Sequence, residues 1–569
     1  MQDDSTQQDL SLGRCRADYE DALQRLERRN FSTRMWCKDP NLWTKDPDQA
    51  DSIVHGLGWL RAPDLTREHL GNLGAFRDEV VDAGFEHVVH MGMGGSSLAP
   101  LLFQRTFEPG EGGLPLTVID TNDPATIERV ESSIPLAKTL FIVASKSGTT
   151  AETRALGDYF FQRVKSETDA DPGASFVAIT DEGSPLEDLA DERGFRKTWL
   201  NFPGIGGRYS ALSYFGMVPA TLMGLPLDEM LQRVAPMENG SSLHTPVADS
   251  SAMRLGAAMG ALAQQGRDKV TFIFPESLET LGMWLEQLLA ESTGKEGTGL
   301  IPIAGEPVAP PDNYGDDRFF VWVHLQSQFD QEREAAVEGL KDAGHPVAEI
   351  ELSDLLDIAR EFYRWEIAVA TAGSVLGINA FNQPNVQAAK DNTSDLLDTV
   401  RDEGSLPELD YCLEGEPLKI SGDCSGDTTE AALEAFLSQA NEGDYFTLLA
   451  YLTETDSTTE TLQDMRLTVR DRLKLATAVG YGPRYLHSTG QLHKGGPNTG
   501  LFIQITASDE PELGVPDEPY SFSTFKHAEA LGDLRALRDN DRRVLRIDID
   551  GDLEAGLSAL KRAVIEATS

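Results

Sequence analysis

The chain has 569 residues, more than one ordinary hydrophobic core can hold, so we expect about three domains. It carries 93 acidic and 49 basic residues, a formal net charge of −44, and such a field repels nucleic acid and anionic membranes. It has no run of about 18 apolar residues to span a bilayer, and its polar, acidic N-terminus lacks the features of a secretory signal, so we expect a cytoplasmic protein.

The acidic residues are spread along the whole chain and lysines are few, a pattern typical of proteins from salt-loving organisms. In molar salt the Debye length falls to about 3 Å, which screens the mutual repulsion of so many carboxylates. We therefore expect a halophilic protein, with a merely acidic mesophilic protein as the alternative. The four cysteines are scattered without a CxxC pair, which argues against a disulfide framework or a zinc site.

Residues 1–70 are expected to form a helical segment, because DYEDALQRLERR has the apolar spacing of an amphipathic helix. In 71–230, short apolar runs alternate with amphipathic stretches. The runs are HVVHMGM at 87–93, LTVID at 116–120, TLFIVAS at 139–145, SFVAIT at 175–180 and RKTWLN at 196–201. Continuous apolar runs are typical of buried parallel strands with helical crossovers, so we predict a doubly wound α/β sheet with ligands at the carboxyl ends of its strands.

The α/β pattern restarts in 231–395, with expected strands at 270–275, 319–325 and 345–352, and predicts a second doubly wound domain. The remaining residues, 396–569, contain the strand-like runs DYFTLLAYL, GLFIQIT and RVLRIDI. This C-terminal extension either completes the second domain or forms a small third one.

The first motif is GMGGSS at 92–97, between an expected strand and an expected helix. Glycines let the backbone approach a ligand closely, and the following helix N-terminus favours an anion. A dinucleotide-binding loop is an alternative because Asp120 ends the next strand, although Ser97 replaces the third glycine of GxGxxG. Taken alone, the motif leaves a phosphate site, a dinucleotide site and a tight turn open.

The second motif is SKSGTTAET at 145–153, again at a strand end before a helix, with five hydroxyls in nine residues. Together with free N–H groups at the helix start, these donors suit a phosphate monoester. The alternative is an ordinary Ser/Thr cap with Glu152 as the capping partner. A cap needs only one hydroxyl, and a dehydrogenase needs no second anion loop, so the motif favours a phosphate site.

These two loops resemble the glycine-rich and hydroxyl-rich loops of the glucose-6-phosphate isomerase family, which has the sugar-isomerase (SIS) fold. Three further segments resemble the family's motifs in the family's order: GGRYS at 206–210, QLLAESTGK at 287–295 and NAFNQPNVQAAK at 379–390. The resemblance implies two SIS domains and an aldose–ketose isomerase of glycolysis and gluconeogenesis. Such an enzyme interconverts D-glucose 6-phosphate and D-fructose 6-phosphate without a metal or cofactor.

LHSTGQ at 486–491 resembles the segment that carries the family's active-site histidine, but here it follows the lysine motif instead of preceding it. This order, and WCKDPNLW at 36–43, resemble the isomerase part of fused transaldolase/glucose-6-phosphate isomerase proteins. With no transaldolase domain in these residues, we expect the isomerase activity alone. The family forms homodimers in which the histidine crosses the interface, so we expect a homodimer and leave open which chain supplies His487.

The reaction moves a proton between carbons 1 and 2 of an open-chain sugar through an enediolate, so it needs a carboxylate base, a nearby cation and a group that opens the ring. Glu291 is the expected base, because its apolar neighbours in LLAEST would bury it and raise its pKa. A lone Glu in this place is more often a surface acid at a helix end, but Gln287, Lys295 and the resemblance to the family favour the base. Arg208 is expected to stabilise the enediolate, with a structural ion pair as the alternative. Gln287, one turn before Glu291, is expected to bind the sugar or phosphate.

By resemblance, His487 and Lys390 act on the ring oxygen and its hydroxyl, with His493 and Lys526 as weaker candidates. The expected substrate-binding residues of the two loops are Gly95, Ser96, Ser145, Lys146, Ser147, Thr149 and Thr150. No His, Asp and Glu set has metal-ligand spacing, so we expect no metal. A silent sugar-phosphate sensor, a dehydrogenase and an isomerase that also accepts mannose 6-phosphate are the alternatives.

Overall fold

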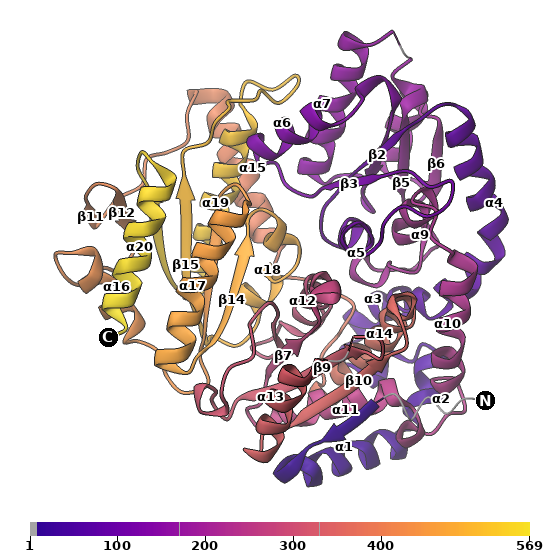
Figure 1. Cartoon of the computed structure of the whole chain (residues 1–569), viewed down its shortest axis with the longest axis vertical. Coiled ribbons are helices and arrows are strands. Elements are labelled where there is room, and N and C mark those ends of the chain that lie inside the picture. The colour runs from indigo at the N-terminus through magenta and orange to yellow at the C-terminus, as the bar shows by residue number, and fades with distance from the viewer. Residues whose placement is uncertain (1–7, 170, 329) are drawn as a thin grey trace.

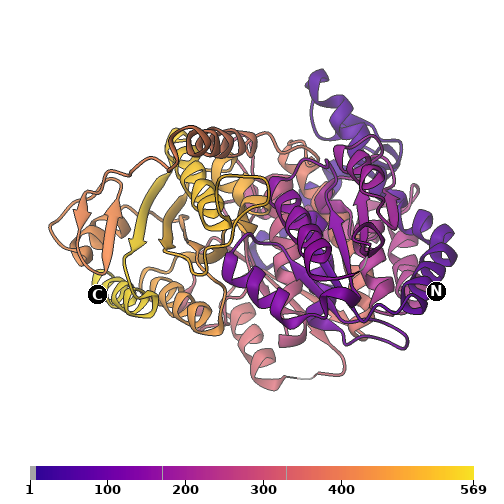
Figure 2. The ribbon, with the colours of Figure 1, turned by 90° about the horizontal axis from the view of Figure 1, so that it is seen from above.

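The computed structural model describes residues 8–169, 171–328 and 330–569. It is an α/β protein with three separate sheets, which confirms the predicted fold class. Figure 1 shows the first sheet at the upper right, the second below it and the third, in orange and yellow, at the left. Seen from above, the C-terminal part extends away from the other two (Figure 2).

The first sheet has five parallel strands in the order β3-β2-β4-β5-β6. Its strands are β2 (His87–Gly92), β3 (Leu116–Ile119), β4 (Thr139–Ala144), β5 (Phe176–Thr180) and β6 (Lys197–Leu200). Each of the five apolar runs forms one of them. β3 lies on one side of β2, whereas β4, β5 and β6 follow on the other side, so the strand order reverses between β2 and β4. Ligands of such sheets bind at this point, outside the carboxyl ends of the strands.

The second sheet has the order β1-β10-β9-β7-β8, and only β1 is antiparallel. Its strands are β1 (Gln8–Ser11), β7 (Lys269–Ile273), β8 (Ile301–Ile303), β9 (Arg318–Leu325) and β10 (Val347–Leu352). The N-terminal segment, expected to be helical, thus also contributes an edge strand.

Helices cover the first two sheets, and one of them is almost wholly enclosed. Every residue of α14 from Ile358 to Ser374 is buried, as expected for a helix between other elements. The helices before the third sheet are α1 (Arg16–Arg28), α2 (Phe31–Trp36), α3 (Ala50–Gly56), α4 (Ala62–Asp82), α5 (Leu98–Thr106), α6 (Pro124–Ser133), α7 (Ala151–Glu167), α8 (Pro185–Glu192), α9 (Tyr214–Leu222), α10 (Leu227–Gly240), α11 (Ser251–Gln264), α12 (Glu279–Thr293), α13 (Gln331–Asp342), α14 (Ile358–Leu376) and α15 (Gln387–Glu403).

The strands from 413 to 549 pair only with one another, in the order β11-β12-β16-β15-β13-β14. They are β11 (Leu413–Glu414), β12 (Leu418–Ser421), β13 (Tyr445–Tyr451), β14 (Ala476–Tyr481), β15 (Gly500–Ala507) and β16 (Arg543–Ile549). The helices are α16 (Thr429–Leu437), α17 (Asp456–Leu473), α18 (Gly490–Gly495), α19 (Phe522–Asp539) and α20 (Leu553–Ala567). Beside β11 and β12, Cys412 and Cys424 form a disulfide, which the sequence did not lead us to expect.

Among the described residues, no helix is both long and apolar enough to cross a bilayer.

Candidate active site

The GMGGSS loop follows β2 at the point where the strand order of the first sheet reverses. Other backbone segments come so close to Gly94 and Gly95 that a side chain at either position would collide with them. A Cβ at Gly95 would lie 2.1 Å from the carbonyl oxygen of Gly207, and one at Gly94 would lie 2.6 Å from that of His487. Three sequence motifs therefore meet here backbone to backbone. Burial lowers the pKa of His90 to about 4, and the neutral ring is hydrogen-bonded to the Ser96 carbonyl at 2.6 Å, which anchors the loop.

The SKSGTT loop follows β4, on the other side of the same point. Its hydroxyls are bonded to each other, Ser145 to Thr150 at 3.1 Å and Ser147 to Thr149 at 2.9 Å. The side chain of Thr150 makes no capping hydrogen bond to α7. The capping alternative is thus not realised. Lys146 is partly exposed and paired with Asp181 at 2.8 Å.

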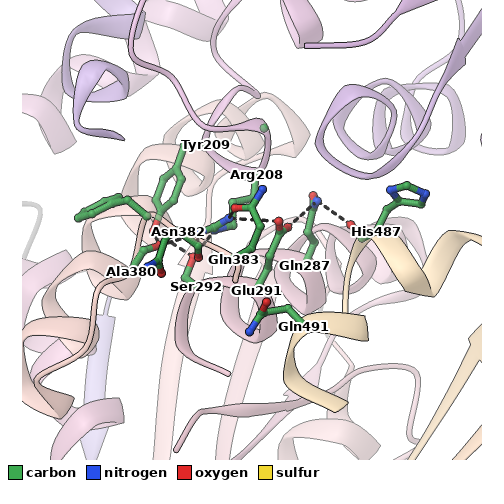
Figure 3. A network of polar contacts seen from close by, with 12 residues as sticks. Arg208, Tyr209, Gln287, Glu291, Ser292, Ala380, Asn382, Gln383, His487 and Gln491 are labelled. Carbon is green, nitrogen blue, oxygen red and sulfur yellow. Dashed lines mark hydrogen bonds and ion pairs between the residues drawn. The ribbon is translucent and has the colours of Figure 1, made fainter. Parts of the chain in front are cut away.

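Arg208 and Glu291 face each other in the interior, as Figure 3 shows. The Arg208 guanidinium, 2 % exposed, lies 3.2 Å from Oε1 of Glu291. Gln287, one helical turn earlier on α12, donates from Nε2 to Oε2 of Glu291 at 3.0 Å. Both carboxylate oxygens therefore have a partner, and the remaining guanidinium donors go to Ser292, Gln383 and the carbonyls of Ala380 and Asn382.

His487 belongs to the same constellation. Its carbonyl accepts a second hydrogen bond from Nε2 of Gln287 at 2.8 Å, and its ring nitrogen Nε2 lies 2.5 Å from Oε1 of Glu152. Burial raises the pKa of Glu152, but the charge of His487 and the hydrogen bonds outweigh it and bring the pKa to about 2. Sequence reasoning assigned Glu152 only as a capping partner. That it is the histidine's partner could not be read from local sequence, because 335 residues separate the two.

The three remaining candidates, and Lys295 of the QLLAESTGK motif, differ in surroundings. Lys390 is exposed near the start of α15, whereas Lys526 is fully buried and ion-paired with Asp123, at 2.7 Å, and with Asp509. His493 is buried among aromatic rings and burial lowers its pKa well below the usual range. Lys295 is also buried, and its Nζ donates to the Asn379 carbonyl at 2.8 Å, so it holds the turn whose carbonyls bind Arg208.

Two polar side chains that sequence reasoning missed support these motifs. Ser292 accepts from Nε of Arg208 at 2.6 Å. Gln491, the last residue of LHSTGQ, donates to the Gly294 carbonyl at 2.8 Å and so joins the histidine segment to the end of α12. Their place within the two motifs was the only available signal.

Two further features bear on the chemistry of the site. The residues that the structure describes contain no group of three or more His, Cys, Asp or Glu able to hold a metal ion. A hollow of about 1280 Å³ is lined by residues including Glu286 of α12, Arg466, Arg484 and, next to His487, Ser488 and Thr489. Of the residues predicted for the site, only the weaker candidate His493 lines that hollow.

Comparison with known proteins gives a consistent result. The family model described as "Phosphoglucose isomerase" matches residues 74–300, which contain four of the motifs. A "Probable glucose-6-phosphate isomerase" of Haloarcula marismortui is 31% identical over 355 residues, 56% of this chain and 79% of that one. A "Glucose-6-phosphate isomerase" of Rubrobacter xylanophilus is 28% identical over 397 residues, 58% of this chain and 87% of that one.

Two solved structures share the fold. A hypothetical protein from Thermus thermophilus aligns with a TM-score of 0.58 and 24% identity over 68% of this chain and 99% of its own. A glucose-6-phosphate isomerase from Chlamydia trachomatis aligns with a TM-score of 0.50 and 21% identity over 65% of this chain and 78% of its own.

Proposed function

The chain belongs to the phosphoglucose isomerase family, and from this premise we propose how its residues interconvert D-glucose 6-phosphate and D-fructose 6-phosphate. The observation that carries the proposal is the Glu291 carboxylate, held by Arg208 and Gln287 next to the GMGGSS loop and the His487 segment. A sensor without catalysis is not favoured, because both the base and its cation are present and paired. No observation favours mannose 6-phosphate as a second substrate.

The phosphate is bound by the SKSGTT loop, through the hydroxyls of Ser145, Ser147, Thr149 and Thr150 and N–H groups at the start of α7. The paired hydroxyls can turn from each other to phosphate oxygens. Lys146 adds a positive charge, since its partly exposed ion pair with Asp181 is weak enough to open. The backbone around Gly95 and Ser96 lines the other side of the sugar.

Glu291 takes the proton from carbon 2 of the open-chain aldose and returns it to carbon 1. When the carboxylate gains this proton, its negative charge passes to the enediolate oxygens of the substrate. The Arg208 guanidinium, 3.2 Å from the carboxylate, stays beside that charge in both states and stabilises the enediolate in a site shielded from water. Gln287 keeps the carboxylate aimed at the two carbons.

Ring opening comes first, because only the open-chain sugar exposes the acidic carbon. We assign it to His487 and Lys390, which act on the ring oxygen and the hydroxyl of carbon 1. Glu152 bonds Nε2 of His487 and so leaves Nδ1 to face the substrate. Lys390 is preferred to Lys526 because its ammonium is exposed, whereas two aspartates hold that of Lys526.

His487 acts in the chain that carries it. The contact that supports this assignment is the side-chain amide of Gln287, which donates to the carbonyl of His487 and to the carboxylate of Glu291 in the same chain. A homodimer stays our expectation for the assembly, but catalysis does not need one to complete the site. We also propose a cytoplasmic location, since doubly charged sugar phosphates do not cross membranes and are used where they are made.

The experiment replaces Glu291 by Gln and follows two reactions of glucose 6-phosphate in heavy water by NMR. Deuterium enters at carbon 2 only through the proton transfer, whereas exchange between the two anomers needs only ring opening. Glu291→Gln should slow deuterium entry and isomerisation at least about 10²-fold and leave anomer exchange in place.

A matched control is Glu286→Gln on the same helix. Glu286 lines a hollow that Glu291, Arg208 and Gln287 do not line, so this variant should behave as wild type. Isomerisation near the wild-type rate in Glu291→Gln would show that another group takes the proton.

A further inference from the structure

One face of α19 is both polar and buried. Lys526, Glu529 and Asp533 recur at helical spacing and are 0 %, 3 % and 0 % exposed. Such groups are retained in an interior only when each has a partner. The partners of this stripe include Asn122 and Asp123, which follow β3 of the first sheet, and Tyr485 of the His487 segment.

The two ends of the stripe fix the surroundings of His487. Asp533 accepts from the Tyr485 hydroxyl at 2.7 Å and is ion-paired with Lys494, so it holds the chain on both sides of His487. Lys526 is ion-paired with Asp123, which begins α6 in the first sheet's domain. The helix therefore joins the histidine segment to the part of the chain that carries Glu152.

Glu529, at the centre of the stripe, is hydrogen-bonded to Glu152. Its oxygen Oε2 accepts from Nδ2 of Asn122 at 2.7 Å. Two buried carboxyl groups in contact cannot both be ionised, so one of them holds a proton.

The surroundings decide which carboxyl holds it. Burial, and then the negative charge of Glu152, raise the pKa of Glu529 well above its usual range. The pKa of Glu152 is lowered instead, because His487 lies against it. Glu529 is thus a neutral hydrogen-bond donor and Glu152 the carboxylate that receives the bond.

We propose that Glu529 is a positioning residue for ring opening, whose protonated carboxyl holds the Glu152 carboxylate against Nε2 of His487. The inference rests on the proposed role of His487. A carboxylate orients a histidine effectively only when its own position is fixed by a hydrogen bond. Glu529 of α19 supplies that hydrogen bond to Glu152. His487, Glu152 and Glu529 thus form one continuous chain of hydrogen bonds.

The test compares Glu529→Gln with Glu529→Leu, using anomer exchange of glucose 6-phosphate as the readout. Gln keeps both contacts, because its amide N–H can donate to Glu152 and its carbonyl can accept from Asn122. Glu529→Gln should therefore stay within about twofold of wild type. Leu keeps the bulk but cannot donate, and anomer exchange should fall about 10-fold or more with the Michaelis constant little changed.

A double-mutant cycle shows whether Glu529 acts through Glu152. Adding Glu529→Leu to Glu152→Gln should cost little beyond the Glu152 change alone, since the contact is already altered. If the Leu variant does not fold, Glu529→Asp serves instead: it stays polar but withdraws the carboxyl from Glu152, and should lose anomer exchange while the Gln variant does not.

Three outcomes overturn the proposal: a loss of about 10-fold in Glu529→Gln, unchanged anomer exchange in a folded Glu529→Leu or Glu529→Asp, or additive effects in the cycle. His487→Ala separates this failure from that of the proposed function. If His487→Ala loses anomer exchange and the Glu529 variants do not, only the positioning role falls. If His487→Ala keeps it, the role of His487 itself is wrong.

Discussion

Two inactive variants decide whether His487 serves its own chain or a partner. One is His487→Ala and the other is Glu291→Gln, mixed in equal amounts and allowed to exchange subunits. In the structure a single amide, Nε2 of Gln287, bonds the His487 carbonyl at 2.8 Å and the Glu291 carboxylate at 3.0 Å. His487 and Glu291 of one chain therefore belong to one site. In every assembly of the two variants, each site then lacks either His487 or the Glu291 carboxylate, so the mixture should stay inactive.

The opposite arrangement gives a clear number. If His487 crossed a dimer interface, half of the dimers after exchange would be mixed, and each would have one complete site of two. Activity would return to about a quarter of the wild-type value. The assay is isomerisation coupled to a dehydrogenase, run in the highest salt that this coupling enzyme tolerates after exchange in molar salt, where the charge of −44 is screened. Native mass spectrometry shows that chains have exchanged, and activity near a quarter would refute the single-chain site.

Three further predictions follow from the contacts of the site and its surroundings. Arg208→Lys keeps the charge but loses the planar donors to Ser292, Gln383 and two carbonyls, so turnover should fall about 10²-fold and the free energy of unfolding by about 2 to 4 kcal/mol, measured by denaturant titration. Ser147→Ala with Thr149→Ala should raise the Michaelis constant about 10-fold with kcat little changed, and unaltered affinity would place the phosphate elsewhere. Burial raises the pKa of Glu286 from 4.5 to about 7, so between these pH values folding takes up a proton and the free energy of unfolding falls as pH rises. Glu286→Gln should therefore be more stable than wild type at pH 8 and have a flatter pH profile. The gain should be only about 1 to 3 kcal/mol, because the carboxyl lines a hollow and is partly solvated.

The first sheet could be predicted from the sequence because its signals are local. Buried parallel strands need continuous apolar runs, and loops at a carboxyl edge need glycine or hydroxyl residues where the backbone turns. The run at 139–145 accordingly contains β4, Thr139–Ala144, and the next residues begin the hydroxyl-rich loop. Arg208, Gln287 and Glu291 could be selected for the same reason, since each lies in a short motif.

The partners of buried charges could not be predicted, because they come from distant parts of the chain. Glu152 has the local pattern of a capping acid, yet its carboxylate goes to His487 and Glu529. Nothing in FSTFKHAEA distinguishes Glu529 from a surface acid until α19 is packed against the first sheet's domain. The disulfide of Cys412 and Cys424 was missed for a similar reason, because they lie twelve positions apart without a CxxC pattern and a β-hairpin brings them together.

The residues proposed for the two halves of the reaction lie next to different sheets. Glu291 and Gln287 lie on α12, which packs on the second sheet, whereas His487 precedes α18 and is held by α19, which belong to the third. The GMGGSS loop of the first sheet approaches both, because a Cβ at Gly94 would lie 2.8 Å from Nε2 of Gln287 and 2.6 Å from the carbonyl oxygen of His487. Proton transfer and ring opening should therefore respond separately to substitutions: changes on α12 should lower deuterium entry more than anomer exchange, and changes on α19 should lower anomer exchange first. Deuterium entry would then fall only as far as ring opening limits the supply of open-chain sugar, because the α12 groups would remain intact.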